Sequence, residues 1–388
     1  MSVVSAIRQI DLSNFRTYAD ARIEAPAGAG VLVLTGANGA GKTNVLEAIS
    51  LLTPGRGLRR ARPAEPDRRG GAGPWAVSAL LEGPEGEVRI GIGRDPTTVD
   101  RRVARVNGAP CRSQKALGAY LNVVWLTPAM DRLFQEGASE RRRFLDRLAY
   151  GFDRDHAGHL IAYERAMRQR AQVLRDGGAE PTWLEALEAR MAVHGVAVAV
   201  TRRALVARLD GGGDAGDPRC FPVAGLRVQG VLDEWLAEAS VEATAERFRR
   251  LLREQRRIDR ERDITSAGPH RSDLLVIHPD GARPAAACST GEQKALLVGV
   301  VLAHAALQAV TRGAAPLLLL DEATAHLDAP RRLALFQRLS ELPAQIWLTG
   351  TDAETFAPLS SSARFFHVEA GQVRPIQRQA GSLKIGKE

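Results

Sequence analysis

Short apolar runs separated by polar turns dominate the first third of the chain. The runs "VLVLT" (residues 31–35), "AVSALLEG" (76–83) and "EVRIGIGR" (87–94) are rich in residues that favour strands, and this pattern predicts β-structure. Asn107-Gly108, inside "ARVNGAP", is a strong signal for a two-residue hairpin turn. We therefore expect residues 1–130 to form a mainly β part of the molecule.

The pattern changes to charged, Arg-rich sequence with helical spacing between about Asp131 and Asp263. Gly-, Pro- and Asp-rich breaks at 176–181 and 210–218 divide it into helices of ordinary length, and no heptad repeat is sustained. We predict an inserted helical arm over residues 131–262. The helical stretches are "ERRRFLDRLAYGFDRDHAGHLIAYERAMRQRAQVLR" (140–175), "TWLEALEARMAVHGVAVAVTRRALVARL" (182–209) and "TAERFRRLLREQRRIDRERD" (244–263).

Apolar segments of several kinds return after the arm, and no internal repeat is visible. The predicted elements are a hairpin with Asp280-Gly281 at its tip, a helix from "STGEQ" to about Thr311 that stops near Gly313, a buried parallel strand at Leu317–Leu320 and a strand within "QIWLTGTD" (345–352). The fold class expected is α/β, with residues 263–388 completing the structure that residues 1–130 begin.

Composition fits a globular chain of 388 residues, with 45% hydrophobic and 25% charged residues. The N-terminus has no basic segment followed by an apolar one, and no apolar run approaches about 18 residues, so export and membrane insertion are not expected. The cytoplasm is the expected location. Cys111, Cys220 and Cys288 lie far apart and are read as reduced thiols without a metal.

The net charge of +8 is carried almost entirely by Arg, with Lys only at 42, 115, 294, 384 and 387. A basic surface favours phosphate-rich partners such as nucleic acid. Genomic base composition can enrich Arg equally well, so charge alone leaves both explanations open.

A glycine-rich loop joins the predicted strand at 31–35 to a predicted helix at 45–52 and fits G-x-x-x-x-G-K-[ST]. Its backbone N–H groups can cradle phosphates at the start of the helix. Lys42 would neutralise the β- and γ-phosphates, and Thr43 would ligate Mg²⁺. The residues assigned to this loop are Gly36, Ala37, Asn38, Gly39, Ala40, Gly41, Lys42, Thr43 and Asn44.

The stretch "PLLLLDEATAHLD" (316–328) has the form of the partner motif, an apolar strand that ends in carboxylates. Asp321 would hold Mg²⁺ through water, and Glu322 would polarise the attacking water. A strand that ends in Asp-Glu is common in proteins, and the assignment depends on the phosphate loop upstream.

A second helix start with anion-binding character precedes that strand. Ser289 and Thr290 each stand three residues before an acid or amide, Glu292 and Gln293, as in a capping box. An ordinary capped core helix would have the same pattern.

ATP-binding cassette proteins carry Leu-Ser-Gly-Gly-Gln at this place, where it covers the γ-phosphate bound by the opposite subunit. "STGEQ" resembles that signature at Ser289, Gly291 and Gln293. Asp328, seven residues after Asp321, resembles the cassette D-loop that reaches across the dimer.

A polar side chain that senses the γ-phosphate is expected at the end of the next strand. The histidine usual in cassette proteins is absent, so the candidates are Thr349 and Thr351. The 279 residues from Lys42 to Asp321 exceed what a compact P-loop domain needs between its motifs. We therefore expect an ATPase head built from both chain ends.

Together these motifs resemble the RecF family of bacterial DNA repair proteins, related to the SMC heads, over essentially the whole chain. The matching stretches are "LSNFRTY" (12–18), "GANGAGKTNVLEAI" (36–49), "LTPGRGLRRA" (52–61), "ERRRFLDRL" (140–148), "YERAMRQRAQVL" (163–174) and "AGPHRSDL" (267–274). Departures from the family occur at Glu292 (more often Gln), at Pro128-Ala129-Met130-Asp131 (more often Pro-Glu-Asp) and at Ser272 (more often Asp). Glu292 would add negative charge close to a bound phosphate.

The resemblance implies ATP-dependent dimerisation on DNA, with weak DNA-dependent ATP hydrolysis that resets the dimer. It also implies cooperation with RecO and RecR in loading RecA at single-strand gaps, and roles in recombinational repair, replication and the SOS response. The expected cofactors are ATP and Mg²⁺, and the expected DNA is double-stranded or a gapped junction. Each ATP would be shared between Lys42 of one subunit and Ser289 of the other.

Several basic positions are candidates for the DNA surface, although a charged face is usually only solvated. Arg16 matches a family motif and would either approach the phosphates or form a structural salt bridge, and His270 is expected to be a hydrogen-bonded hinge residue. The DNA candidates are Arg56, Arg59, Arg60, Arg62 and Arg141.

Three rival classes share parts of this pattern. A nucleotide-binding subunit of a membrane ABC transporter would have a shorter gap between its motifs and a histidine switch. A tethering SMC head would need a coiled coil of hundreds of residues. A small-molecule kinase would have no use for "STGEQ".

Overall fold

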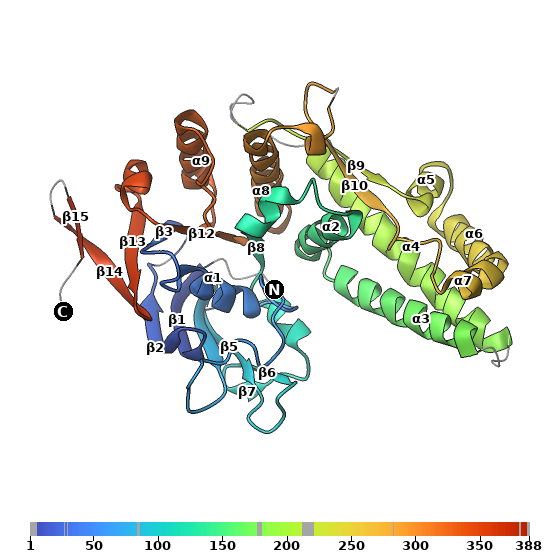
Figure 1. The fold of residues 1–388 in the computed structure, drawn as a ribbon, viewed down its shortest axis with the longest axis horizontal. Coiled ribbons are helices and arrows are strands. Elements are labelled where there is room, and N and C mark those ends of the chain that lie inside the picture. Colours follow the sequence, from blue (N-terminus) through green and yellow to red (C-terminus); the bar gives the residue numbers. More distant parts are fainter. Residues whose placement is uncertain are drawn as a thin grey trace. The chain divides into compact units, whose positions relative to one another are not determined.

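The computed structural model describes residues 6–26, 28, 30–83, 86–176, 181–211, 221–281, 283–379 and 382–385. The described residues form two compact units. The first unit contains the described residues up to Asp131, Phe221, and the described residues from Val301 onward. The second unit contains the remaining described residues between Arg132 and Val300. The boundaries 131–262 expected for the arm stay a prediction. Figure 1 shows the elements of both units.

An antiparallel sheet forms one layer of the first unit, in the strand order β2-β1-β4-β5-β6-β7. Its strands are β1 (Ala6–Phe15), β2 (Tyr18–Glu24), β4 (Ala76–Gly83), β5 (Gly86–Arg94), β6 (Arg102–Val106) and β7 (Ala109–Pro110). Asn107 and Gly108 join β6 to β7 with φ of 48° and 82°, the left-handed pair that a type I′ turn requires. The predicted hairpin is confirmed.

The other sheet of this unit has the order β15-β14-β13-β3-β12-β11-β8. Its strands are β3 (Gly30–Thr35), β8 (Val123–Leu126), β11 (Leu317–Leu320), β12 (Gln345–Gly350), β13 (Ala363–Glu369), β14 (Gln372–Gln379) and β15 (Ser382–Ile385). The strands from β13 to β8 are parallel. All four leucines of β11 are buried, as expected for a strand covered on both faces.

Helix α1 (Lys42–Leu51) follows β3, and every residue of it except Thr43 is buried. Its apolar side chains share one core cluster with residues of both sheets, including Ile10, Val77 and Trp347. The first unit also contains α9 (Ala329–Glu341) and the short helices η1 (Gln114–Ala119), η2 (Pro128–Arg132) and η4 (Glu354–Leu359).

The second unit is mainly helical, as the Arg-rich pattern predicts. Its elements are α2 (Ala138–Phe152), α3 (His156–Asp176), α4 (Pro181–Gly211), β9 (Gly225–Gln229), α5 (Val231–Glu238), α6 (Val241–Glu254), α7 (Arg256–Arg262), β10 (Asp273–Ile277) and η3 (Ala285–Ala287). Helices α3 and α4 pack along each other (Figure 1). The apolar core of this unit includes Tyr163, Met191 and Phe248.

Strand β9 was not predicted, because its five residues follow a loop-like break inside an otherwise helical stretch. It pairs antiparallel with β10 along its whole length. The predicted hairpin around Asp280-Gly281 is therefore only partly correct. Gly281 makes the turn with φ 72°, but beyond it Ile277 and Pro284 form a single isolated bridge.

Buried ion pairs hold the helices of the second unit together. Arg170 binds Asp259 at 2.7 Å and Glu188 at 3.1 Å, and all three side chains are at most 1% exposed. Arg202 forms a second such pair with Asp146 at 2.8 Å. His270 is hydrogen-bonded on both ring nitrogens, to Tyr163 and to the Thr265 carbonyl, and burial lowers its pKa to about 4.

Helix α8 (Thr290–Arg312) begins in the second unit and ends in the first. It is the one described helix with the length and apolar composition of a membrane span, and 61% of its most apolar window is buried inside the structure. A mostly buried core helix passes the same test, so this feature is weak support for a membrane role.

Candidate nucleotide-binding site

The loop between β3 and α1 has the backbone that a phosphate cradle needs. Gly36, Gly39 and Gly41 all have positive φ, at 148°, 80° and 117°. A Cβ on Gly36 would lie 2.2 Å from the carbonyl oxygen of Val368, so only glycine fits beside that turn. Tyr18 donates its hydroxyl hydrogen to the Gly41 carbonyl at 3.0 Å and fastens the end of the loop to the antiparallel sheet.

Lys42 lies within the curve of this loop and is 5% exposed. Its Nζ donates to the carbonyls of Gly36 at 2.6 Å and Ala37 at 2.9 Å. Burial lowers the pKa of Lys42, while Glu322 and Asp321 act in the opposite direction. An ammonium group held among carbonyls and near two carboxylates is placed to neutralise a phosphate.

The parallel sheet brings Thr43 and Asp321 together, although they are far apart in sequence. Thr43 Oγ1 lies 3.0 Å from each oxygen of the Asp321 carboxylate. Among the described residues, no group of three or more His, Cys, Asp or Glu side chains could hold a metal. One hydroxyl and one carboxylate fit Mg²⁺, which usually takes its other ligands from water and phosphate.

Thr349 completes this cluster from the end of β12. Its hydroxyl donates to Asp321 Oδ1 at 2.7 Å and accepts from the backbone N–H of Glu322 at 2.9 Å. Thr351 is exposed, so of the two candidate sensor residues the structure brings only Thr349 to Asp321. Glu322 itself has φ 49°, a strained conformation that often marks functional residues.

The start of α8 carries the predicted capping box. Ser289 Oγ accepts from the Glu292 N–H at 3.3 Å, and the Glu292 carboxylate accepts from the Ser289 N–H at 2.7 Å. These hydrogen bonds lower the pKa of Glu292. Ser289 is exposed and Gly291 is half-buried, so both can meet a ligand. Gln293 is 1% exposed and donates to the Cys288 carbonyl at 2.8 Å, which makes it a support of the turn.

Asp328 caps α9, where its carboxylate accepts from the Arg331 N–H at 2.8 Å. Its side chain remains 57% exposed. The cap stabilises the start of α9, and a role of Asp328 across a dimer stays a prediction.

Arg16 forms the salt bridge that was one of its two predicted roles. Its guanidinium binds both oxygens of Glu47, at 2.6 and 2.9 Å, and donates to the Glu65 carbonyl at 2.8 Å. Glu47 is 1% exposed and also binds Arg59 at 2.9 Å. Sequence reasoning missed Glu47, although it stands in the quoted motif on the buried helix α1.

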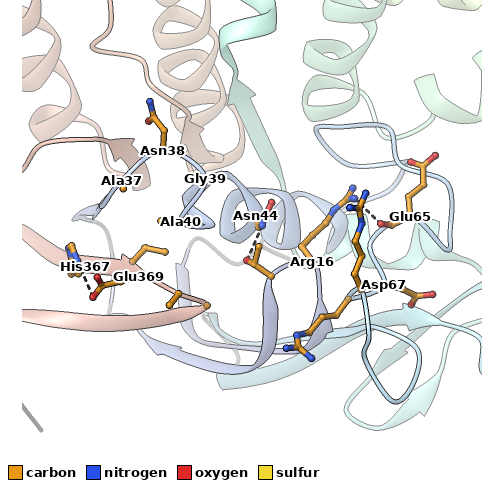
Figure 2. A pocket seen from close by; sticks show the side chains of 16 residues that line it. Arg16, Ala37, Asn38, Gly39, Ala40, Asn44, Glu65, Asp67, His367 and Glu369 are labelled. Atoms are coloured by element: carbon orange, nitrogen blue, oxygen red, sulfur yellow. Dashed lines mark hydrogen bonds and ion pairs between the residues drawn. The ribbon is translucent and has the colours of Figure 1, made fainter.

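A cavity of about 1090 Å³ adjoins the outer face of the phosphate loop. Figure 2 shows Arg16, Asn44 and His367 among the side chains around it. Residues 65, 67–69 and 367–371 also line this cavity, and no nucleotide role was predicted for them, because no periodicity distinguishes them. Its position beside the loop is where the rest of a nucleotide would extend.

Four of the five candidate DNA residues, Arg56, Arg59, Arg60 and Arg62, are exposed on the segment after α1. Of these, Arg59 also donates to Asn44 at 2.8 Å and to Glu47. Arg141 differs from the role expected for it. It binds the Asp273 carboxylate at 2.7 and 2.8 Å with a side chain only 17% exposed, so its charge is used inside the second unit.

A phosphate loop and an Asp-Glu strand that meet at the carboxyl edge of a parallel sheet, next to an antiparallel layer, define an ATPase head of the ATP-binding cassette type. The family model "RecF/RecN/SMC N terminal domain" matches residues 6–374. The chain belongs to this family and, within it, to the RecF family, as the motifs predicted.

Relatives of known name are similar in sequence to this chain over nearly its whole length. "DNA replication and repair protein RecF" of Mesorhizobium japonicum is 49% identical over 383 residues, which is 97% of this chain and 100% of the relative. The protein of the same name from Brucella suis is 44% identical over 379 residues, 96% of each chain.

Solved structures show the same fold. "Recombination mediator protein RecF-ATP in RecFOR pathway" superposes with a TM-score of 0.84 at 22% identity, over 97% of this chain and 99% of the other. An Smc head domain from Pyrococcus furiosus superposes with a TM-score of 0.51 at 16% identity, over 97% of this chain and 96% of the other. The predicted fold class is confirmed.

Proposed function

We propose that this chain is an ATP-dependent DNA-binding repair protein that dimerises on DNA when it binds ATP and leaves the DNA after slow hydrolysis. The observation that carries the proposal is the convergence of Lys42, Thr43, Asp321 and Thr349 at the mouth of the phosphate loop. The relatives named as replication and repair proteins, and the solved relative with ATP, support it.

Each residue of the cluster has a chemical task in this proposal. Lys42 would neutralise the β- and γ-phosphates, and Thr43 and Asp321 would hold Mg²⁺, which would offset the negative charge that develops in the transition state. Thr349 keeps the Asp321 carboxylate oriented through its hydrogen bond of 2.7 Å. Glu322 polarises the attacking water from a position near Lys42.

Ser289 of a second copy completes the site in this proposal. Its exposed hydroxyl stands at the start of α8, where helix N–H groups favour an anion. ATP then bridges the interface between two subunits, and loss of the γ-phosphate weakens that interface. Residues of both copies are needed for hydrolysis, which couples the reaction to dimerisation.

DNA is the partner that the charge and the relatives favour. The net charge of +8 supports binding to the phosphate backbone without sequence readout. We extend to this chain the cooperation with RecO and RecR in RecA loading, the SOS role and the cytoplasmic location that the RecF resemblance implies. The alternative of a transporter subunit has no support among the reported relatives.

Glu322→Gln tests this function directly. Without the carboxylate that polarises water, hydrolysis should fall roughly a hundredfold or more while ATP binding is retained. The ATP-bound protein should therefore remain on gapped DNA after challenge with competitor, measured by fluorescence anisotropy.

Lys42→Ala is the matched control, and it should abolish ATP binding and ATP-dependent DNA retention together. The proposal fails if Glu322→Gln leaves DNA as fast as the unaltered protein while its hydrolysis is blocked.

A further inference from the structure

A second, smaller hollow, with a basic lining, lies in the first unit on the antiparallel sheet and shares no lining residue with the cavity beside the phosphate loop. It has a volume of about 170 Å³ and is formed by stretches 101–104 and 110–114 together with Ile92. Three of its lining residues are Arg101, Arg102 and Arg112, and none is acidic. The volume, on the order of five to six waters, has room for one phosphate group.

Arg102 lies in the wall of this hollow in a fixed position. Its guanidinium donates to the Ala61 carbonyl at 2.7 Å and stands over the ring of Trp75, 5.7 Å from the centroid. Trp75 is fully buried, so the ring is a rigid support. The Nε of Arg102 is buried and has no hydrogen-bond partner among the described residues.

Positive charge gathers around Arg102, and the carboxylates that act on it, Glu47 and Glu65, do not line the hollow. Burial first, and then the neighbouring Arg56, lowers the pKa of Arg102. Arg112 is exposed, and the side chain of Arg101 is 69% exposed. Asp95 pairs with Arg101 only at 3.8 Å and already accepts three hydrogen bonds from Thr97 and Thr98.

The hollow is joined to the Arg-rich segment that follows α1. The Gln114 side chain, in the wall of the hollow, donates to the carbonyls of Leu51, Thr53 and Gly55. Arg56, Arg60 and Arg62 are exposed on that segment. A run of basic side chains with one phosphate-sized hollow suits an extended polyanion better than a single free anion.

We propose that this hollow binds one phosphate of the DNA backbone, with Arg102 fixing its position and Arg101 and Arg112 donating from the rim. The proposal rests on the proposed DNA-binding function and names one contact point within it. Because the contact is to a phosphate, it contributes to binding of any DNA sequence.

The test combines a charge change with a footprint. Arg112→Glu should weaken ATP-dependent binding to gapped DNA roughly tenfold and lower the salt dependence of log Kd by about one. Cys111 also lines the hollow and is half-buried. Bound DNA should therefore slow its alkylation by N-ethylmaleimide, read by peptide mass spectrometry.

Arg105→Ala is the control, because Arg105 is exposed on β6, the strand that carries Arg102, but does not line the hollow. It should bind DNA as the unaltered protein does. ATP binding by both variants reports whether the head is intact.

Four results would overturn the inference. They are an Arg112→Glu variant with unchanged affinity, an equal loss in Arg105→Ala, an unchanged alkylation rate at Cys111 with DNA bound, and equal protection of Cys111 by inorganic phosphate at the same phosphate concentration. The proposed function fails separately, if the unaltered protein shows no ATP-dependent DNA binding.

Discussion

The hydroxyl of Thr349 holds two residues of the candidate site in position. It donates to the carboxylate of Asp321 and accepts from the N–H of Glu322, so it fixes both residues of the Asp-Glu pair. The chain has no histidine at this strand end. A threonine that orients the Asp321 carboxylate, the proposed Mg²⁺ ligand, is a different solution from a side chain that reaches the γ-phosphate itself.

Replacing Thr349 with valine keeps the shape and removes both hydrogen bonds. A hydrogen bond to a charged group contributes about 1.5–3 kcal/mol, so ATP hydrolysis should fall roughly tenfold or more while ATP affinity changes little. Steady-state ATPase assays and nucleotide titrations measure the two quantities. Thr351→Val is the control, because Thr351 is exposed; equal effects of the two substitutions would contradict the assignment.

Asp233 is a second residue whose environment predicts a measurable effect. It is 3% exposed, and burial raises the pKa of its carboxyl to about 6. The folded protein therefore holds a proton between about pH 4 and 6 that the unfolded chain has lost. The stability that this proton contributes is present below about pH 4 and is lost as the pH rises through 6.

Asp233→Asn should therefore stabilise the protein at pH 7.5 by on the order of 2–3 kcal/mol and leave it unchanged near pH 4. Urea unfolding at the two pH values measures this difference. Glu234→Gln is the control from the same helical turn, because Glu234 is exposed. A gain of the same size at both pH values would show that the charge of Asp233 is not its cause.

At the scale of elements, periodic apolar patterns predicted most of the fold. The long helices of the second unit, strand β11 and the hairpin at Asn107-Gly108 all follow local sequence rules. Strand β9 could not be predicted from local sequence rules, because it forms by pairing with β10, more than forty residues away in the chain. Short strands that exist through a distant partner leave little local signal.

The same division holds for the site. The loop, the Asp-Glu strand and the capping box are local motifs and could be found in the sequence. The choice of Thr349 over Thr351, the Glu47 pair with Arg16 and the lining at 367–371 depend on which strands lie side by side. Register in the parallel sheet decides the first and third of these contacts, and packing of α1 against the β1–β2 turn decides the second; periodicity encodes neither.

Helices α3, α4, α6 and α7 meet at one buried guanidinium. Arg170 binds Glu188, Asp259 and the Leu252 carbonyl, and Arg256 binds Glu188 from the surface side at 2.6 Å. Arg170→Met would leave two carboxylates buried with less compensation. Breaking a buried pair in this way costs about 3–5 kcal/mol.

We therefore expect a large fall in the thermal and urea stability of Arg170→Met. Arg168→Met removes an arginine from the exposed face of the same helix, where its side chain is 69% exposed. The exposed ion pair of Arg168 with Glu164 should contribute under about 1 kcal/mol to stability. Equal stability of the two variants would show that the Arg170 cluster does not hold these helices together.

At the scale of the whole molecule, the two candidate phosphate-binding helix starts belong to different units of the chain. Lys42 lies in the first unit and Ser289 in the second. Between them lie the Arg-rich helices, whose arginines are nearly balanced by Asp and Glu. We infer that ATP binds at the interface of a dimer, where Lys42 of one copy and Ser289 of the other both contact it.

Mixing two inactive variants tests this sharing most directly. Lys42→Ala lacks the loop lysine, and Ser289→Arg blocks the helix start of α8. In a mixed dimer, one site combines both defects and the other combines an intact Lys42 with an intact Ser289. If each copy used only its own residues, both sites would stay defective.

The measurement is the ATPase rate of each variant alone and of an equal mixture on DNA. Each alone should be inactive, and the mixture should recover about a quarter of the unaltered rate, because half of randomly paired dimers are mixed and each has one intact site. A mixture as inactive as its components would contradict a site shared between two copies.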